Sequence, residues 1–471
     1  MRILFILPDV NSFHKLNIHF GIAYIAGYAK ANGYQDIRFT TVSSGEDYDR
    51  VVNEVTAYRP DIVGFTSVET QFNNVRKLSK LIKEKHGCVI LCGGAFPTIY
   101  PECIKDAEHV DALVRGESEA AVLKIVQAVE QKRDFRQIEN VCYYLRQDDR
   151  VVKNPLLPLE TDLVQFGFPD RGIFKFQAVI DSYGGAAPFM FNRGCPYNCS
   201  FCSNHALAAV YGNPRNMTRR RNVDSCIAEI RDVDAKYRFD MIHIWDDLFT
   251  SDRKWLYEFL DKYRKDVGKP FMCTTRSNLC DDELFTKLKD AGCYRVHMSL
   301  ESGNDFIRNR VMKRSISREA IVKSFGLAKK YGIEINASSI IGLPFETEAM
   351  IRETIDLLGL LQVDSPGVNV FYPYKGTRLR EVCEEYGMID PGIKYDIQER
   401  RESILELPHI GKARLRYYQR NFESLVRRKQ GIRHYARYLA IKAVHLAIKA
   451  AKLLLPGKIV ATLRMRKKRG Q

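Results

Sequence analysis

The stretch Arg193-Gly-Cys195-Pro-Tyr-Asn-Cys199-Ser-Phe-Cys202 places three cysteines within eight residues. Thiolates at this spacing can share one metal centre only where the chain forms a tight loop, which Pro196 and Asn198 favour. Thiolates select soft metals, above all iron–sulfur clusters, zinc and copper(I). In a cubane cluster, three local thiolates leave one iron free for a substrate or cofactor, unless a remote cysteine binds it. A zinc site completed by His205 or a distant cysteine is the alternative.

These residues also carry a resemblance to a known family. The cysteine spacing, with Phe201 just before the last cysteine, closely resembles the cluster motif of radical S-adenosylmethionine (SAM) enzymes. The resemblance implies that Cys195, Cys199 and Cys202 hold a [4Fe–4S] cluster. It also implies that the amino and carboxylate groups of SAM chelate the fourth iron.

Length and composition indicate an ordinary globular protein. The 471 residues suggest two or three domains, and the hydrophobic content of 45% is typical of soluble proteins. Nine further cysteines are scattered, mostly beside apolar residues, and look like buried free thiols. The apolar run before Pro8 is too short for a signal peptide, so we expect a cytoplasmic protein.

The net charge of +16 is concentrated at one end of the chain. From Arg427 onward there are fourteen Lys or Arg residues and no Asp or Glu, so residues 1–426 carry only +2. The basicity therefore belongs to a tail, and the body has no strong charge of its own.

Residues 1–135 alternate apolar strands with amphipathic helices over short connections. This pattern predicts a doubly wound parallel sheet whose ligands bind beyond the carboxyl ends of the strands. No Gly-x-Gly-x-x-Gly follows the first strand, which argues against a dinucleotide. The candidate cofactor-binding residues are those at the strand ends, namely Ser67, Gly93, Gly94, Gly116 and Glu117.

This half of the chain resembles the cobalamin-binding domain that often precedes a radical SAM barrel. The matching phrases are Gly21–Ala26, Pro60–Gly64, Gly93–Thr98 and Val114–Glu117. The resemblance implies a Rossmann-like domain that binds cobalamin. No histidine here has Asp two places before it, so the cobalt would lack the lower histidine ligand of cobalamin-dependent mutases. A flavodoxin-like domain without a cofactor is the alternative.

The next two segments are a linker and a second α/β domain. Residues 136–185 contain a small hairpin and a proline-rich connector. Residues 186–385 contain six strand and helix units, which predict a partial (β/α)6 barrel of the TIM type with its chemistry at the carboxyl ends of the strands. The strands are expected at 188–193, 241–245, 271–275, 295–300, 334–340 and 368–371.

Polar or glycine residues follow nearly every predicted barrel strand. By resemblance, Glu301 matches the acidic residue that binds the ribose or methionyl end of SAM, with Ser302 beside it. Asp246 stands near the family's site for the methionyl amino group, although Trp-Asp-Asp replaces the usual Gly-Gly-Glu. Arg276 could pair with the SAM carboxylate as a bidentate fork, and Gly342 ends the fifth strand. The alternative for each carboxylate is to cap the following helix.

The last two segments are helical and increasingly basic. Residues 386–426 form a helical extension, and 427–471 form a basic amphipathic tail whose helix spans about 432–455. Lysines interrupt its apolar runs, so it does not predict a membrane-spanning helix. We expect it to contact an anionic membrane surface, with packing on the barrel as one alternative and nucleic acid as a less favoured one.

The resemblance implies a cobalamin-dependent radical SAM enzyme. Electron transfer from the cluster would cleave SAM to a 5′-deoxyadenosyl radical, and cobalamin would supply a methyl group to an unactivated carbon of a small or lipid-like metabolite. Ring closure or rearrangement without methyl transfer is the first alternative. A cobalamin-responsive binding protein with a structural cluster is an alternative of another class. A reductase, flavodoxin or ferredoxin is the expected electron donor.

Overall fold

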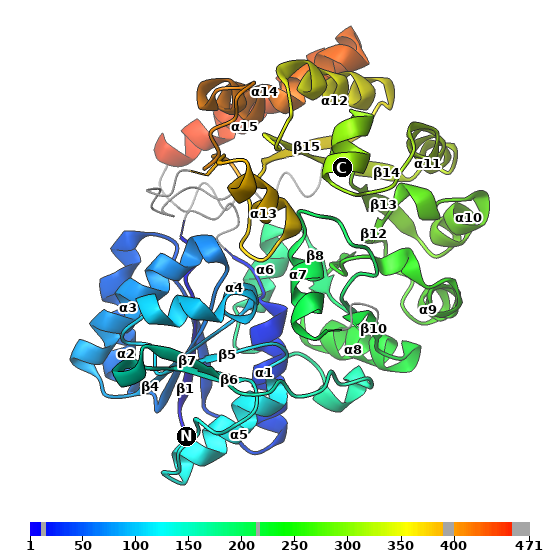
Figure 1. Cartoon of the computed structure of the whole chain (residues 1–471). Coiled ribbons are helices and arrows are strands. Elements are labelled where there is room, and N and C mark those ends of the chain that lie inside the picture. The colour runs from blue at the N-terminus through cyan, green and yellow to red at the C-terminus, as the bar shows by residue number, and fades with distance from the viewer. Residues whose placement is uncertain (11–15, 213–216, 390–399, 455–471) are drawn as a thin grey trace.

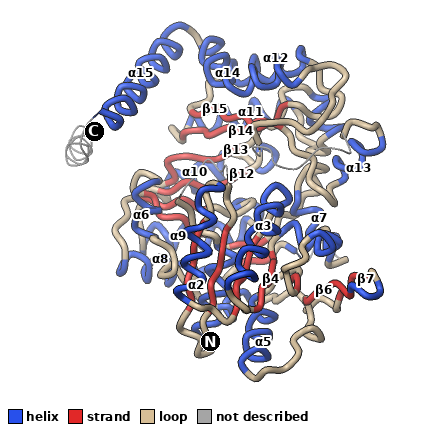
Figure 2. The backbone as a smooth tube through the Cα atoms, turned by 90° about the vertical axis from the view of Figure 1, so that its left-hand side faces the viewer, coloured by secondary structure: helices blue, strands red, loops and turns tan. Residues whose placement is uncertain are grey.

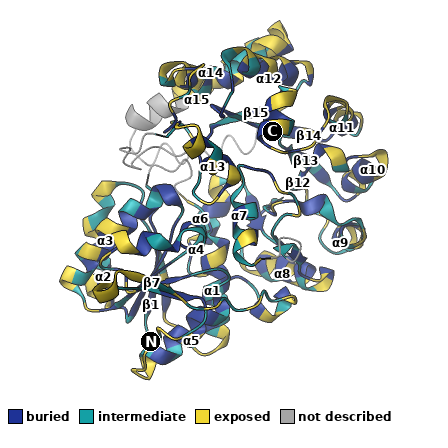
Figure 3. Ribbon diagram, in the orientation of Figure 1, coloured by how far each residue is buried: buried dark blue, intermediate teal, exposed yellow. Residues whose placement is uncertain are grey.

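The computed structural model describes residues 1–10, 16–212, 217–389 and 400–454. It shows an α/β chain built on two large β-sheets, followed by a helical C-terminal segment (Figure 1). The strands are buried between helices whose outer faces are exposed (Figure 3). The predicted fold class is confirmed.

Five parallel strands form the centre of the first sheet. In the order β2-β1-β3-β4-β5 they are Ile37–Thr41, Ile3–Leu7, Ile62–Thr66, Val89–Gly93 and Ala112–Val114. Both β1 and β3 are buried at every position, because helices cover the two faces of a parallel sheet. One face packs against α1 (Phe20–Ala31) and α5 (Glu119–Glu130), and the other against α2 (Tyr48–Tyr58) and α3 (Phe72–Lys85).

A hairpin extends this sheet beyond the boundary expected from the sequence. Its strands β6 (Val141–Leu145) and β7 (Arg150–Lys153) are antiparallel, and β6 pairs with β5. From the sequence, this hairpin is expected within the linker of residues 136–185. Because Val141 and Cys142 are fully buried, the hairpin covers an apolar sheet edge, and the first sheet ends at Lys153.

Six parallel strands form the second sheet. In the order β15-β14-β13-β12-β11-β8 they are Ser365–Val370, Glu334–Ile341, Cys293–Met298, Phe271–Thr275, Met241–Ile244 and Ala186–Phe189. The helices between them are α8 (Val223–Lys236), α9 (Arg253–Asp266), α10 (Asp282–Asp290), α11 (Arg318–Lys330) and α12 (Glu348–Leu360). Each strand lies beside its neighbour in the sequence, which confirms the predicted partial barrel.

Alternate residues of the barrel strands face its inside. In β14, Ile335, Ala337 and Ile341 are buried against the helices, while Asn336 and Ser338 between them are only partly buried. The neighbouring strands β12 and β13 also alternate over most of their length. The inside of this half-barrel is therefore not filled by its own side chains, unlike that of a closed barrel.

Three helices complete the C-terminal part. They are α13 (Arg378–Glu385), α14 (Lys412–Gln430) and α15 (Ile432–Leu454). One face of α14 buries Leu415, Tyr418, Phe422 and Val426 and packs on α12 and β15, so this helix extends past the boundary expected at 426. The end of the predicted tail, 455–471, lies outside the described residues. Among the helices that the structure describes, none is long and apolar enough to cross a membrane.

A buried ion cluster joins the first domain, the linker and the barrel. Glu229 of α8 pairs with Arg171 of the linker at 2.6 Å and with Arg221. Arg221 also donates to the hydroxyl of Tyr24 on α1 at 3.4 Å. All four side chains are at most 5% exposed, so the charges of this cluster depend on one another for compensation.

We expect Glu229→Ala to lower the free energy of unfolding by about 3–5 kcal/mol, because it leaves two guanidinium groups buried without a partner carboxylate. Urea denaturation measures the change. Asp232→Ala on the same helix is the matched control, since Asp232 forms an exposed pair with Lys236 at 2.8 Å and its loss should cost about 1 kcal/mol or less. Equal losses for the two variants would contradict the buried-cluster interpretation.

Candidate active site

The cysteine loop begins after a short strand pair, at a position that requires glycine. β9 (Asn192–Arg193) pairs antiparallel with β10 (Arg219–Arg220), and Gly194 follows with φ +80°. A Cβ on Gly194 would lie 2.4 Å from the carbonyl oxygen of Met217. Only glycine fits this left-handed position without displacing the backbone.

The middle of the loop is tied to two distant barrel segments. Ser200 donates its amide to the Met312 carbonyl at 3.1 Å and its hydroxyl to the Val311 carbonyl at 2.7 Å. The Leu379 amide of α13 donates to the Ser200 carbonyl at 2.9 Å. These bonds hold the backbone between Cys199 and Cys202 in place.

Arg276, at the end of β12, lies directly beside a cysteine. Its Nη1 is 3.6 Å from the Cys199 sulfur, and its guanidinium stacks 3.8 Å above the ring of Tyr197. The remaining donors reach the Asn278 side chain at 2.9 Å and the Arg314 carbonyl. The sequence suggested that Arg276 could pair with a SAM carboxylate, and here its guanidinium lies beside the Cys199 sulfur.

The three loop cysteines are free thiols, the number that a cubane with one open iron binds. Among residues that the structure describes, no three His, Cys, Asp or Glu side chains lie close enough together to hold a single metal ion. Burial raises the pKa of Cys202 to about 12, so cluster binding must release thiol protons.

Glu301 follows β13 and is held by an arginine that the sequence did not reveal. Its carboxylate accepts from Arg314 at 2.9 Å, and its backbone has φ +62°. The following helical turn, Ile307–Val311, begins after Phe306, so Glu301 does not cap it. Burial raises the pKa of Glu301, while Arg314 and Arg276 oppose the rise.

The two aspartates after β11 have different surroundings. The Asp246 carboxylate is 1% exposed and accepts the amides of Phe191 and Asn192 at 2.7 and 3.1 Å. Through Oδ1, Asp246 therefore supports the backbone that leads into the cysteine loop, while its Oδ2 has no hydrogen-bond partner among the described residues. Asp247 is exposed and hydrogen-bonds with the Gly194 amide and the Asn204 side chain, so it is the carboxylate beside the loop.

Two other predicted residues shape strand ends. Gly342 has φ +79°, and its amide donates to the buried Glu346 at 2.6 Å. Ser302 is fully buried; its hydroxyl accepts from the Asn304 amide at 3.3 Å, and its carbonyl accepts from Arg308 at 3.0 Å. Both bonds fix the turn that directly follows Glu301.

At the first sheet, the predicted strand-end residues lie together. The Ser67 amide donates to the Gly93 carbonyl at 2.9 Å. A Cβ on Gly94, where φ is +100°, would lie 2.8 Å from the backbone nitrogen and oxygen of Ser67. Ser67, Gly93 and Gly94 thus form a closely packed edge whose only side chain is the small one of Ser67, and a large ligand can approach its backbone.

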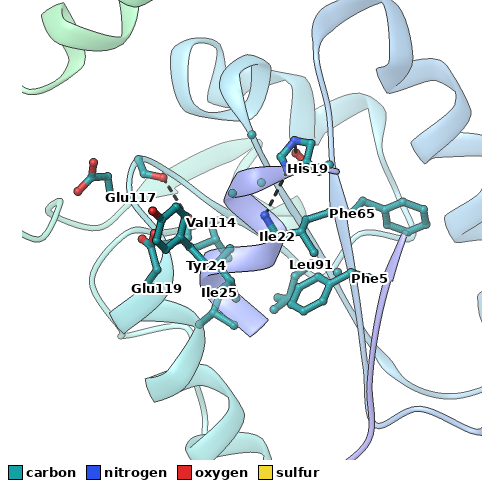
Figure 4. A pocket seen from close by; sticks show the side chains of 18 of the residues that line it. Phe5, His19, Ile22, Tyr24, Ile25, Phe65, Leu91, Val114, Glu117 and Glu119 are labelled. Carbon is teal, nitrogen blue, oxygen red and sulfur yellow. Dashed lines mark hydrogen bonds between the residues drawn. The ribbon is translucent and has the colours of Figure 1, made fainter. Parts of the chain in front are cut away.

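A cavity of about 270 Å³ lies between this sheet and the helices α1 and α5 (Figure 4). Phe5, Ile22, Leu91 and Val114 form part of its apolar lining, and His19 lies at one side. The His19 ring accepts the Ile22 amide at 3.2 Å, and burial lowers its pKa to about 4, so His19 is neutral here.

Gly116 and Glu117 connect this edge to the barrel domain. A Cβ on Gly116 would lie 2.1 Å from the hydroxyl oxygen of Tyr211, which accepts the Glu117 amide at 2.7 Å. The Glu117 carboxylate pairs with Arg193 at 3.2 Å and with Arg219. The sequence predicted contact with a cofactor for both residues. It contains no local pattern from which their long-range partners could be predicted.

The residues present fit a bound corrinoid. The small side chains at the strand ends leave space for a corrin ring, and the apolar cavity suits the flat aromatic base of its nucleotide tail. Gly93, Gly94 and the cavity lining would hold these two parts.

We expect replacement of any one of Cys195, Cys199 and Cys202 by Ala to remove most bound iron and sulfide, because two local thiolates cannot hold a [4Fe–4S] cluster. Iron and sulfide assays on anaerobically purified protein measure the loss. Cys88→Ala, in the core of the first domain, is the control and should keep its iron. Full iron content in a loop variant would contradict the assignment.

Gly94→Ala should reduce bound cobalamin at least about tenfold, since the new Cβ would both clash with Ser67 and strain a left-handed backbone. Absorbance of protein purified after hydroxocobalamin supply gives the cobalamin content. Gly87→Ala is the matched control, because no atom lies within 4 Å of the Cβ there. Equal cobalamin in both variants would exclude this edge as the binding site.

Comparison with known protein families matches the two halves separately. Residues 9–126 match the B12 binding domain, and residues 189–358 match the radical SAM superfamily. The chain is 28% identical to the anaerobic magnesium-protoporphyrin IX monomethyl ester cyclase of Rubrivivax gelatinosus over 86% of this chain and 75% of that protein. It is 25% identical to an uncharacterised methyltransferase of Pyrococcus horikoshii over 84% and 88%.

Solved structures share the fold at low sequence identity. The methyltransferase TsrM from Kitasatospora setae, with cobalamin and a [4Fe–4S] cluster bound, superimposes with a TM-score of 0.67 and 16% identity over 89% of this chain and 85% of that one. OxsB, with aqua-cobalamin and SAM bound, gives 0.71 and 13% over 95% and 71%. The chain combines a B12 binding domain with a radical SAM domain, and it belongs to the cobalamin-dependent radical SAM enzymes.

Proposed function

We propose that this enzyme methylates an unactivated carbon of a small or lipid-like metabolite. One observation carries the proposal: the carboxyl-end side of the first sheet, where the candidate cobalamin residues lie, contacts the barrel domain directly at several points. Methyl transfer from a corrinoid requires such closeness, since the two cofactors must reach one substrate carbon. Among the relatives, the Pyrococcus protein bears the name of a methyltransferase.

Contacts at two points support a shared substrate space. Glu69, in the short helical turn after β3, accepts the Lys375 amide at 2.8 Å, so the loop after β15 rests on the first domain. Phe20 of α1 packs edge-to-face on Trp245 at the end of β11, with ring centroids 6.1 Å apart. The two domains are therefore in contact at two separate points, which would favour exclusion of water from reactive groups between them.

The inner wall of the barrel offers uncharged hydrogen-bonding groups. Ser299 and Ser338 share a hydrogen bond of 2.7 Å between their hydroxyls, and His297 lies 3.1 Å from the Ser299 hydroxyl. Burial lowers the pKa of His297, which keeps the ring neutral. His297 and Ser299 lie at the end of β13, just before Glu301, and Ser338 lies on the neighbouring strand β14. These groups could orient a hydroxyl, carbonyl or amide of a substrate.

When bound, the cluster supplies an electron for SAM cleavage, and cobalamin supplies a transferable methyl group. Cys195, Cys199 and Cys202 would bind the cluster, and the Arg276 guanidinium would lie beside the Cys199 ligand. Glu301, fixed by Arg314, would accept hydrogen bonds from SAM at the barrel mouth. A flavodoxin, ferredoxin or reductase would deliver the electron.

Ring closure without methyl transfer is the second candidate function. The observation that favours it is the 28% identity with the cyclase of Rubrivivax gelatinosus, which covers both domains. The two candidates share every residue named above, so product analysis must separate them.

Methyl transfer predicts two products from SAM in about equal amounts, 5′-deoxyadenosine and S-adenosylhomocysteine, because one SAM is cleaved and another is the methyl donor. We expect this ratio when the reduced holoenzyme acts on a small-molecule extract of its host, with a new metabolite labelled from SAM carrying a trideuterated methyl group. Liquid chromatography with mass spectrometry measures all three.

The Cys199→Ala variant is the control and should form none of these products. If 5′-deoxyadenosine forms in stoichiometric amounts without S-adenosylhomocysteine and without a labelled metabolite, methylation is contradicted and ring closure or rearrangement becomes the favoured function. Absence of 5′-deoxyadenosine under all conditions would favour the binding-protein alternative.

A further inference from the structure

The C-terminal helix α15 has little cover from the rest of the chain. No residue from 432 to 447 is buried, and only Tyr435 and Tyr438 are partly covered. Figure 2 shows α15 running away from the body after its contact with α14. This helix segment, about 24 Å long, is therefore an exposed surface that the fold does not explain.

One line of α15 is apolar and exposed. Ile432, Leu439 and Leu446 are spaced by seven residues, or about two helical turns, and are 89%, 46% and 60% exposed. Small alanines at 436 and 443 lie between them on the same side. A globular helix normally buries such a line against its core, so this line lacks a partner within the described chain.

The other sides of α15 carry its positive charges, together with the exposed Ile441 and Val444. Arg433, Arg437 and Lys442 project from other sides of the helix, and no Asp or Glu follows Glu423 in the sequence. Five further Lys or Arg residues lie between 464 and 469. The complement to this helix must supply negative charge and apolar contact along its whole length.

We propose that α15 lies in the interface of an anionic lipid bilayer. A bilayer offers anionic headgroups and acyl chains at every point of its surface, which matches an exposed apolar line flanked by cations. The helix is not apolar enough to span the membrane, so it lies along the surface. This inference is independent of the reaction, and it places the active site near membrane-borne compounds.

The test is flotation of the full-length holoprotein with vesicles of phosphatidylcholine alone or with about a third phosphatidylglycerol. We expect binding only to the anionic vesicles, with a loss of at least about tenfold when salt rises from about 0.1 to 0.5 M, because screening weakens the cationic contacts. Leu439→Glu with Leu446→Glu should lower binding at least about tenfold, as should Arg433→Gln, Arg437→Gln and Lys442→Gln together.

Matched controls lie elsewhere on the surface. Leu360→Glu on α12, where Leu360 is 68% exposed, and Lys265→Gln on α9 should leave vesicle binding unchanged. Iron content and circular dichroism confirm that each variant folds. Equal binding by the leucine variant, absence of binding to anionic vesicles, or a dimer or RNA complex that depends on Leu439 and Leu446 while vesicles do not bind would each overturn the proposal.

Discussion

The Arg193 side chain links the cysteine loop of the barrel to the first domain, and the relative position of the two domains depends on it. It stands two residues before the first cysteine of the cluster loop, yet its guanidinium pairs with Glu119 of α5 at 2.6 Å and with Glu117 at 3.2 Å. It also lies over the rings of Tyr24 and Phe166 at 4.9 and 5.0 Å. The Arg193 side chain is only 16% exposed, and a guanidinium so largely buried needs such partners, so the cysteine loop and the first domain must be placed together.

A second joint acts from the opposite direction. Glu69 comes from the first domain and holds the loop after the last barrel strand, through the Lys375 amide and through Arg380 at 3.6 Å. One joint thus fixes the beginning of the barrel and the other its end. Because both are buried and charged, sliding of one domain on the other would expose or unpair charges, which makes a single arrangement strongly preferred.

The sequence predicted the strands, the helices and the loops between them, because period and glycine position are local properties. The three cysteines could be identified as candidate cluster ligands for the same reason, because their spacing is also local. It could not reveal that Arg314 holds Glu301, or that Tyr211 packs on Gly116, because nothing within a few residues records a partner far along the chain. Asp246 illustrates the limit: its position at a strand end was predictable, but the direction of its side chain depends on the strand's alternation and on the amides of Phe191 and Asn192.

Three buried carboxylates perform the same task at different loops around the barrel mouth. Asp246 accepts amides at the entry to the cysteine loop, Glu346 accepts those of Gly342 and Leu343, and Glu69 accepts that of Lys375. Burial raises the pKa of all three, to about 7 for Asp246 and about 8 for Glu346, in opposition to the amides. Such groups are costly for stability, and apolar side chains would be less so. What they provide is a fixed backbone at the loops that carry the site. Radical chemistry needs that order, because a reactive group must meet one carbon and no other.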